Sequence, residues 1–410
     1  MLVQKFGGTS VATREGRSAM GSRVRRARED GYAVVVVVSA MGRAGAPYAT
    51  DTLLGLLAGM PTQPRERDML SSCGELVSAV VVAHELRAEG LPAAAYSGAD
   101  AGILTDGRYG EAAVLAVDPS PLRGALAGGL VPVVAGFQGA APDGSTATLG
   151  RGGSDTTACA IAVALSADAV EIHTDVDGVM TADPRACPEA RVLDVVRYEE
   201  LFQMARHGAQ VVHPAAAQAA MEGGVPTRIR NTFSSARGTL VTFAERLSAE
   251  RLSRVATAVS NAAGIARLRV SLPGGLEDAD RTLAQTRVYR AMADAGVSLD
   301  MFTPMDGTLA FSVTERDLPL AEETLRRLDA PYEVDRGLAK VTLVGAGMHG
   351  VPGVMARVAE CLASARVGIL QTADSHATIS VLVPGAQARD AVRALHDGFG
   401  LADAAPVVDG

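Results

Sequence analysis

The sequence contains no tryptophan, and aromatic residues make up only 4% of its 410 positions. Hydrophobic residues nevertheless account for 48% of the chain, so its interior must be built from alanine, valine and leucine. Such small side chains suit closely packed layers of helices and strands. A chain of this length is also too long for one ordinary hydrophobic core, which indicates two or three domains.

Cysteine is scarce as well. The four cysteines, Cys73, Cys159, Cys187 and Cys361, are far apart, form no C-x-x-C pair and have no histidine at metal-ligand spacing. They are typical of free thiols in a reducing compartment. The chain starts with a strand pattern in place of a signal peptide, and its apolar runs are far shorter than a membrane span. We therefore expect a cytoplasmic protein with no membrane partner.

Positive charge is limited, because 38 lysines and arginines face 46 acidic residues and give a formal net charge of −8. No basic stripe interleaved with aromatic residues is present, so we expect no nucleic-acid partner. Only two of the 38 are lysine, Lys5 and Lys340. Because the chain otherwise uses arginine for positive charge, lysine at position 5 suggests a chemical requirement. His173, His207 and His213 lie in separate elements and indicate neither a Ser-His-Asp triad nor a metal site.

Residues 1 to about 245 alternate short apolar runs with helical patterns. The expected strands are residues 2–6, 33–40, 93–97, 131–137, 169–175 and 227–231. Continuous apolar strands separated by helices predict a mostly parallel sheet that is covered on both faces. Ligands bind at the carboxyl ends of such strands, where this sequence places GGTS, SAMG, GFQG and TDVDG.

From about residue 264 onward, two segments of the chain resemble each other at an offset of 70 positions. Residues 292–302 align with 362–372, and the same offset superposes GTLAFSV on ATISVLV. An internal duplication of a βαββαβ unit explains this pattern. We expect a domain over residues 1–245, a linker over 246–263, and small units over 264–332 and 333–410. The open sheet edges of such units favour pairing with a second copy.

The segment KFGGTS directly follows the first expected strand. Gly7 and Gly8 allow the backbone to approach a phosphate closely, Thr9 and Ser10 add donors, and Lys5 supplies a compact charge. The segment is not a P-loop of the G-x-x-x-x-G-K type. A plain turn would explain the two glycines if Lys5 were absent.

The segment GRGGSD, residues 150–155, lies between a polar turn and an alanine-rich helical pattern. A turn with positive φ would explain the glycines, and Ser154 or Asp155 would then cap the following helix. Bare N–H groups at a helix start also bind anions, and the guanidinium group of Arg151 fits a carboxylate or phosphate. The pattern alone leaves both interpretations open.

Two further segments carry acidic residues. SCGE places Glu75 at the start of an apolar helix, where a carboxylate interacts favourably with the helix dipole. If Glu75 faces the same cleft as Arg151, the pair could bind the ammonium and carboxylate groups of an amino acid. TDVDGVMTADPR is either an acidic hairpin or a nucleotide loop, in which Thr174 and Asp175 meet the base or ribose and Arg185 reaches phosphate.

Together these segments resemble the aspartate kinase family. The resemblance rests on KFGGTSV, VVVVSAMG, SCGE, VAGFQG, GRGGSDTTA, TDVDGVMTADPR and the C-terminal repeats with GAGMHGVPGV and QTADSH, in order over nearly the whole chain. It implies an α/β amino-acid-kinase fold followed by two regulatory ACT domains. The implied activity is transfer of the γ-phosphoryl group of MgATP to the β-carboxylate of L-aspartate, the first step towards lysine, diaminopimelate, threonine and methionine. A carboxylate nucleophile needs no general base, so the lack of a catalytic histidine agrees with this activity.

Carried over by motif position, the resemblance implies roles for individual residues. Lys5 and Asp155 would be catalytic, with Asp155 organising the lysine and the metal-bound phosphates. The implied nucleotide contacts are Lys5, Phe6, Gly7, Gly8, Ser39, Thr174, Asp175, Met180, Asp183, Arg185 and Gln210. The implied substrate contacts are Thr50, Glu75, Arg151, Gly152, Gly153 and Ser154. Glu75 would take the substrate ammonium and Arg151 its α-carboxylate, whereas Mg²⁺ would arrive with ATP and need no side-chain cage.

Two positions depart from the family pattern. Gln210 stands where the family often has lysine, and Met180 stands where aromatic residues are common. Both positions resemble nucleotide contacts, so we expect the departures to affect nucleotide affinity or selectivity.

The paired repeats imply an allosteric amino acid bound where ACT units meet, and a homodimer formed through these units. The effector could be lysine, threonine or diaminopimelate, and dimerisation alone would also explain the repeats. The candidate effector residues are Gly275, Glu277, Val297, Asp300 and Met348. Two other functions stay open: a kinase of another carboxylate, such as glutamate, and a catalytically silent amino-acid sensor. The presence of Lys5 and Asp155 argues against the sensor.

Overall fold

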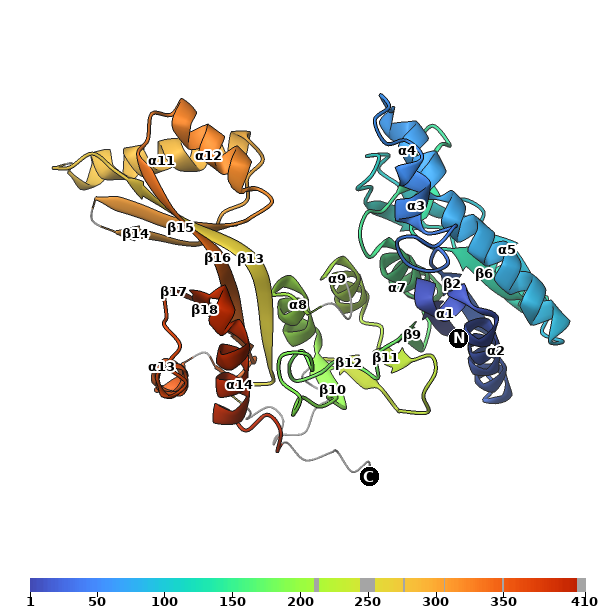
Figure 1. Ribbon diagram of the computed structural model, residues 1–410. Helices are drawn as coiled ribbons and strands as arrows, with labels where there is room; N and C mark the ends of the chain where they lie inside the picture. The colour runs from blue at the N-terminus through green and yellow to red at the C-terminus, as the bar shows by residue number, and fades with distance from the viewer. Residues whose placement is uncertain (210–213, 244–254, 276, 306, 349, 404–410) are drawn as a thin grey trace.

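The chain folds into an N-terminal and a C-terminal part, each built around its own large β-sheet (Figure 1). The computed structural model describes residues 1–410 except 210–213, 244–254, 276, 306, 349 and 404–410. An eight-stranded sheet organises the N-terminal part and a six-stranded sheet organises the C-terminal part. A small four-stranded sheet accompanies the first.

The eight-stranded sheet has the strand order β10-β12-β11-β9-β1-β2-β6-β3. Its strands are β1 (Leu2–Phe6), β2 (Val34–Val38), β3 (Ala93–Tyr96), β6 (Val131–Ala135), β9 (Ala169–Thr174), β10 (Val195–Arg197), β11 (Thr227–Asn231) and β12 (Thr239–Thr242). Neighbouring strands are parallel except β11 and β12, which are antiparallel. The predicted mostly parallel sheet is confirmed, and all six expected strands are present.

Alternate residues of the central strands enter two separate cores. Val34, Val36 and Val38 of β2 share a core with α2 (Arg14–Glu29) and α5 (Cys73–Ala88). Val35 and Val37 point the other way, into the core of α6, α7, α8 and α9. These helices span Ser120–Ala127, Gly153–Leu165, Tyr198–Arg206 and Pro214–Gly223. Side chains alternate along a strand, so helices on both faces require the continuous valine run of β2.

Shorter elements surround the carboxyl ends of these strands. They are α1 (Gly8–Ala12), α3 (Thr50–Gly55), α4 (Pro64–Ser71) and the sheet β5-β4-β7-β8. The four strands of that sheet are β4 (Ile103–Thr105), β5 (Val114–Val117), β7 (Gln138–Ala140) and β8 (Thr146–Thr148). Strand β8 ends two residues before the GRGGSD segment, so this sheet carries the turn that presents Arg151.

Helices α4 and α5 together form one helical stretch, Pro64–Ala88, that is long and apolar enough to cross a membrane by composition alone. The expectation of only short apolar runs therefore needs correction. Half of the apolar window is buried inside the protein. Ala79, Val82 and Leu86 join the core beneath the sheet, so the stretch packs as a core helix.

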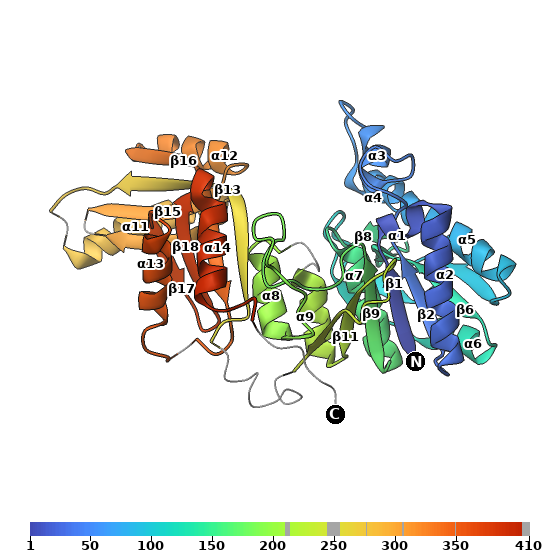
Figure 2. The same cartoon turned by 60° about the horizontal axis from the view of Figure 1, so that its bottom comes forward.

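The six-stranded sheet is antiparallel throughout and has the order β14-β15-β13-β16-β18-β17. Its strands are β13 (Ala258–Ser271), β14 (Asp300–Met305), β15 (Thr308–Thr314), β16 (Tyr332–Val344), β17 (Gln371–Asp374) and β18 (Thr378–Pro384). Helices α11 (Asp278–Asp294) and α12 (Leu318–Arg327) pack on one half, and α13 (Val354–Ser364) and α14 (Ala388–Gly398) pack on the other (Figure 2).

The expected duplication is present in the fold. An offset of 70 residues carries α11, β14, β15 and α12 onto α13, β17, β18 and α14. Buried positions correspond as well, because Met292 and Leu362 are both fully buried, as are Leu325 and Leu395.

The two units are interleaved through β13. Its first part, Ala258–Ala263, pairs with the second half of β16, whereas Ile265–Ser271 pairs with β15 and with the first half of β16. Gly264 separates the two parts at a positive φ of 68° beside a register shift. The expected linker over 246–263 therefore needs correction, since residues 258–263 form a strand of the second unit. This strand stands in the place of the predicted C-terminal strand, for which the described residues after α14 contain no counterpart.

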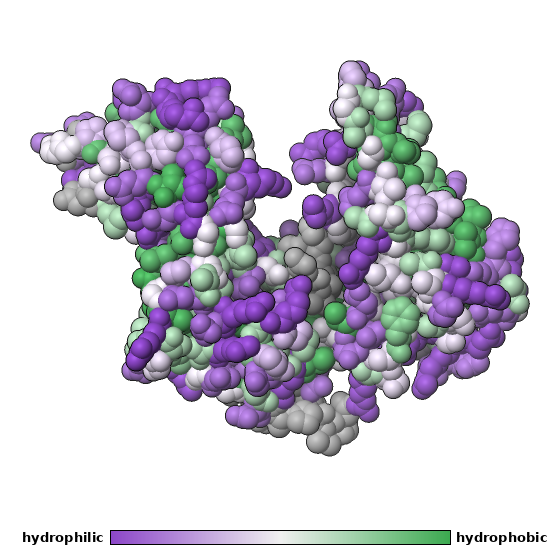
Figure 3. Space-filling model, viewed as in Figure 1, coloured by the Kyte–Doolittle hydropathy of each residue, from purple (hydrophilic) through white to green (hydrophobic). Residues whose placement is uncertain are grey.

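A segment of the N-terminal part packs into the second unit. Ala182, Ala186 and Cys187 join the core of α13 and α14. The hydroxyl of Thr181 lies 2.9 Å from Nε2 of His396, and Arg393 Nε donates to the carbonyl of Ala186 at 2.8 Å. Away from this contact, Figure 3 shows a broad hollow between the C-terminal units and the projection formed by α3 and α4.

The interleaving predicts how fragments of the C-terminal part behave. A fragment of residues 255–403 retains both parts of β13 and should unfold in one cooperative transition. A fragment of residues 264–403 lacks Ala258–Ala263, which exposes the edge of β16 and should cause aggregation. Urea unfolding and light scattering compare the two. Equal cooperativity and solubility of both fragments would show that β13 does not link the units.

Candidate active site

A cavity of about 540 Å³ lies where β1, β2 and the start of α7 meet. Ten residues predicted from the sequence line it: Lys5, Gly8, Ser39, Thr50, Glu75, Arg151, Gly152, Gly153, Ser154 and Asp155. They come from segments up to 150 positions apart in the chain, so the fold gathers the KFGGTS, SAMG, SCGE and GRGGSD segments around one space.

Lys5 and Asp155 form a buried ion pair in this cavity. Nζ of Lys5 lies 2.6 Å from Oδ1 of Asp155, and each side chain is only 11% exposed. Lys5 is held at the end of β1, between Val37 and Ile172 of the neighbouring strands. Asp155 lies in the first turn of α7. The pair therefore fixes the central strand of the sheet to the helix that carries GRGGSD.

Glu75 is the second buried acid of the cavity. Its Oε1 accepts a hydrogen bond from the backbone N–H of Ala40 at 3.1 Å, while its buried Oε2 has no partner. Burial raises the pKa of Glu75 from 4.5 to about 7 despite this hydrogen bond. An orphaned carboxylate oxygen in a polar cavity is suited to a cationic ligand group, which would supply the missing partner.

The GRGGSD segment forms a turn and a helix start at the same time. Gly150 and Gly152 both have φ of 71°, a conformation that glycine adopts without strain. Helix α7 begins at Gly153 with Gly152 as its N-cap, so the expected capping by Ser154 or Asp155 is wrong. Both side chains lie in the first turn instead. The exposed Arg151 stands on the turn at the cavity wall.

The glycines of KFGGTS leave room at the end of β1. A Cβ atom on Gly7 would lie 3.8 Å from Nζ of Lys5, and one on Gly8 would lie 2.6 Å from the carbonyl oxygens of Ala40 and Gly42. Phe6 is fully buried and stacks on His173 with ring centroids 4.5 Å apart. Of these residues, Phe6 can reach a ligand only through its backbone.

The residues of TDVDGVMTADPR lie beside the cavity and beyond it. Thr174 is the last residue of β9, next to β1. Asp175 follows it and forms an ion pair with Arg43 of the cavity wall. Asp183 and Arg185 pair with each other at 2.9 Å, and this hydrogen bond lowers the pKa of Asp183. Met180 forms an isolated β-bridge with Val192 and does not line the cavity, while Gln210 lies outside the described residues.

Comparison with known proteins decides the family. The model of the amino acid kinase family matches residues 1–231, and an ACT domain model matches residues 333–397. Aspartokinase 1 of Bacillus subtilis (strain 168) is 44% identical over 405 residues, which cover 98% of this chain and 99% of the relative. The chain belongs to the aspartokinase family. The predicted aspartate kinase with an ACT regulatory region is thereby confirmed.

Solved aspartokinase structures share the whole fold. E. coli aspartokinase III in complex with aspartate and ADP is 27% identical, covers 97% of this chain and 99% of its own, and has a TM-score of 0.79. The same E. coli enzyme in complex with lysine and aspartate, in its T-state, is 26% identical at the same coverage and has a TM-score of 0.76. The similarity includes both the kinase part and the regulatory units.

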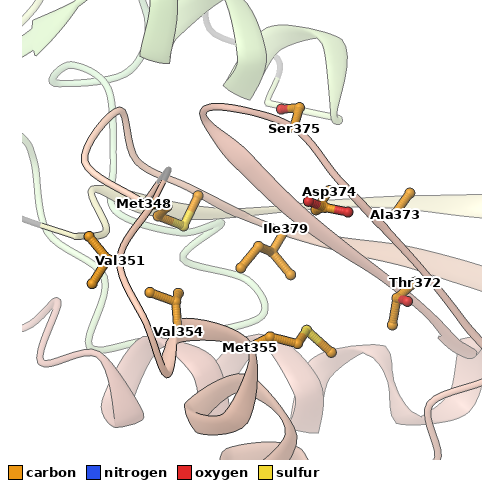
Figure 4. A pocket seen from close by; sticks show the side chains of 10 residues that line it. Met348, Val351, Val354, Met355, Thr372, Ala373, Asp374, Ser375 and Ile379 are labelled. Atoms are coloured by element: carbon orange, nitrogen blue, oxygen red, sulfur yellow. The ribbon is translucent and has the colours of Figure 1, made fainter.

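This aspartokinase has a second cavity, of about 330 Å³, in its second regulatory unit (Figure 4). Figure 4 shows Met348, Val354 and Ile379 around the space between α13 and the β17–β18 hairpin, with Asp374 on the hairpin. Of the five effector candidates, Met348 lines this cavity.

The other effector candidates lie in the first regulatory unit. Val297 is in its core and only 5% exposed, and Asp300 pairs with Lys340 of β16. Gly275 and Glu277 immediately precede α11. The five residues are therefore not gathered at one place within a single chain.

Several residues of the main cavity were not predicted from the sequence. They are Ala40, Gly42, Arg43, Ala44, Ala49, Asp51, Leu54, Arg67, Gly110, Glu111, Phe137 and Gly150. Phe137 carried a signal, because it belongs to the GFQG segment at the end of β6. Its positive φ of 70° turns the backbone so that its N–H donates to Oγ1 of Thr157. Arg67 and Glu111 had no recognisable pattern, since they reach the cavity only through the packing of α4 and the small sheet.

No metal cage is evident in the part of the chain that the structure describes, where no three His, Cys, Asp or Glu side chains cluster. Burial also raises the pKa of Cys159, one turn after Asp155, to about 12. This thiol stays protonated at neutral pH, and no cysteine is among the residues that line the cavity.

The raised pKa of Glu75 predicts a pH-dependent stability difference for Glu75→Gln. Between pH 4.5 and about 7 the folded protein keeps a proton that the unfolded chain has lost, so the free energy of unfolding falls as pH rises. Glutamine can still accept the Ala40 N–H bond but carries no charge. Relative to wild type, the free energy of unfolding of the variant should therefore be higher at pH 8 than at pH 5, by up to about 3 kcal/mol. Urea unfolding at the two pH values measures this difference. An equal difference at both pH values would contradict the raised pKa.

Proposed function

We propose that this aspartokinase transfers the γ-phosphoryl group of MgATP to the β-carboxylate of L-aspartate, forming 4-phospho-L-aspartate for the synthesis of lysine, threonine and methionine. The observation that carries the proposal is the meeting of Lys5, Glu75 and Arg151 around one cavity. The aspartate and ADP complex of the E. coli relative supports both ligands.

The charges of the cavity suit a zwitterionic amino acid. Glu75 has an unpartnered buried oxygen for the substrate ammonium, and Arg151 offers a planar fork to the α-carboxylate. Thr50, Ser154 and the backbone of Gly152 and Gly153 complete the substrate side. With both α-groups held, the β-carboxylate stays free to attack.

Lys5 and its neighbours suit the transferring phosphoryl group. Gly7 lies beside Nζ of Lys5, since a Cβ atom there would lie 3.8 Å from it, and Ser39 follows β2 at the same end of the sheet. Asp155 holds Lys5 in place and neutralises it until phosphate oxygens arrive. Catalysis then consists of alignment and charge stabilisation, because a carboxylate is already a nucleophile at neutral pH. The bound Mg²⁺ would supply further neutralisation of the phosphates.

We assign binding of the nucleotide base and ribose to the segment TDVDGVMTADPR beside the cavity. Thr174 and Asp175 lie next to β1 at the cavity rim, where the Arg43 pair must open or shift to admit a ligand. Met180, Asp183, Arg185 and Gln210 keep their proposed nucleotide role by resemblance. Phe6 contributes through its backbone.

We assign regulation to residues 255–403. An amino-acid effector, lysine, threonine or diaminopimelate, would bind the ACT units. The E. coli relative in complex with lysine supports an amino-acid effector of this kind. The cavity beside Met348 and Asp374 (Figure 4) is one candidate place. By the 70-residue offset, its counterpart in the first unit lies at the start of α11 near Glu277. A homodimer would form through these units, in which β14 and β17 are the two end strands of the sheet. A cytoplasmic location suits a biosynthetic kinase.

The acceptor specificity predicts the result of a coupled ADP-release assay. Aspartate should support turnover, whereas glutamate and N-acetylglutamate should not, because Glu75 and Arg151 fix one distance between the α-groups and the reacting carboxylate. Each acceptor is assayed with and without lysine and threonine, and inhibition by either supports the regulatory assignment. Turnover with glutamate but not with aspartate would overturn the proposed substrate, and no turnover with any acceptor would favour a silent sensor.

A further inference from the structure

Asp68 is a buried carboxylate outside the predicted site. It is only 2% exposed and lies in α4, seven residues before Glu75. Only Ser72 separates α4 from α5, and its backbone is also helical, with φ of −70° and ψ of −16°. Seven residues make nearly two helical turns, so Asp68 and Glu75 lie on the same side of one helical rod.

The Asp68 carboxylate joins this rod to two separate loops. Its Oδ2 accepts a hydrogen bond from the backbone N–H of Thr148 at 2.7 Å and another from Gly110 at 2.9 Å. The two loops also bind each other, because Ala112 N donates to the Thr148 carbonyl at 2.9 Å. Both distances are those of well-formed hydrogen bonds, so one oxygen fixes both loops to α4.

Both loops carry parts of the cavity wall. Thr148 ends β8 three residues before Arg151, and Gly110 directly precedes Glu111. A Cβ atom on Gly150 would lie 3.2 Å from the carbonyl oxygen of Gly110, which shows how closely the GRGGSD turn packs on the second loop. The position of Arg151 is therefore set through Thr148 and Gly110.

A neutral contact near the helix junction supports the same arrangement. Nε2 of Gln138 donates to the carbonyl of Ser72 at 3.1 Å, and Gln138 pairs with Thr148 in the small sheet. The helical rod is thus attached to the β7–β8 pair at two successive turns. Glu75, on the next turn, reaches the loop after β2 through Ala40.

We propose that Asp68 is a positioning residue for the acceptor substrate, which sets the distance between the Arg151 guanidinium and the Glu75 carboxylate. This inference rests on the proposed substrate roles of Arg151 and Glu75. Asp68 itself does not line the cavity. It acts by holding the two charges at the separation of the α-groups of an amino acid.

The test is steady-state kinetics of the full-length enzyme with aspartate and MgATP varied separately. Asp68→Ala should raise KM for aspartate by about tenfold and leave kcat and KM for MgATP within about twofold. Asp68→Asn keeps an acceptor oxygen and should raise KM for aspartate by only about threefold. Asp118→Asn is the matched control, since Asp118 accepts a backbone N–H bond from Ser120 within its own turn and does not line the cavity. It should leave both KM values unchanged.

A double-mutant cycle with Arg151→Ala separates this inference from the proposed function. If Asp68 acts through Arg151, Asp68→Ala should change KM for aspartate by less than about twofold in the Arg151→Ala background. Multiplied effects, or an equal rise in KM for MgATP, would overturn the positioning role and leave the substrate assignment intact. An Arg151→Ala enzyme with wild-type KM for aspartate would overturn both.

Discussion

The buried pair of Lys5 and Asp155 is the interaction on which the rest of the site depends. Two charges that are each 11% exposed are stable at this depth only because they face each other at 2.6 Å. Removing one partner of such a pair costs about 3–5 kcal/mol, because the other charge stays buried and uncompensated. The first strand and the first turn of α7 must therefore meet. Gly153 permits this meeting, since a Cβ there would lie 2.8 Å from Phe137 and 2.9 Å from Leu149.

The same region connects the kinase part to the regulatory units. The chain that leaves β9 passes Thr174 and Asp175 beside the cavity and then enters the core of the second unit at Ala182, Ala186 and Cys187. In a second contact, Glu200 of α8 accepts hydrogen bonds from Thr257 at 2.6 Å and from the backbone of Ala346 at 3.2 Å. Kinase and regulatory parts therefore share contacts at both ends of the segment between β9 and α8.

The sequence was sufficient for the elements whose hydrophobic pattern is local. Short runs such as LVQKF, AVVVVV and VPVV located parallel strands. Glycine-rich segments that follow these runs located the cavity, because the carboxyl ends of parallel strands lie at the same edge of a sheet. The 70-residue repeat located α11 and α13, since buried positions such as Met292 and Leu362 recur in register.

What the sequence could not predict depends on contacts between distant residues. The exchange of β13 between units needs the pairing of Ala258–Ala263 with β16, and small alanine-rich stretches show no clear strand period. Asp68 appears as an ordinary helix residue until Thr148 and Gly110 are placed beside it. The helix cap at Gly152 was missed because the backbone, and not a side chain, starts α7.

The central claim is that the charge of Lys5, aligned by Asp155, stabilises the transferring phosphoryl group. The most direct measurement is kcat of Lys5→Met and of Lys5→Met/Asp155→Asn, which leaves no unpaired charge. Arg267→Met is the matched control, because Arg267 is 12% exposed and pairs with Asp335 in the regulatory sheet. Both Lys5 variants should lose about 10³-fold or more in kcat while folded, and the control should retain its activity. A folded Lys5→Met enzyme with wild-type kcat would contradict the account.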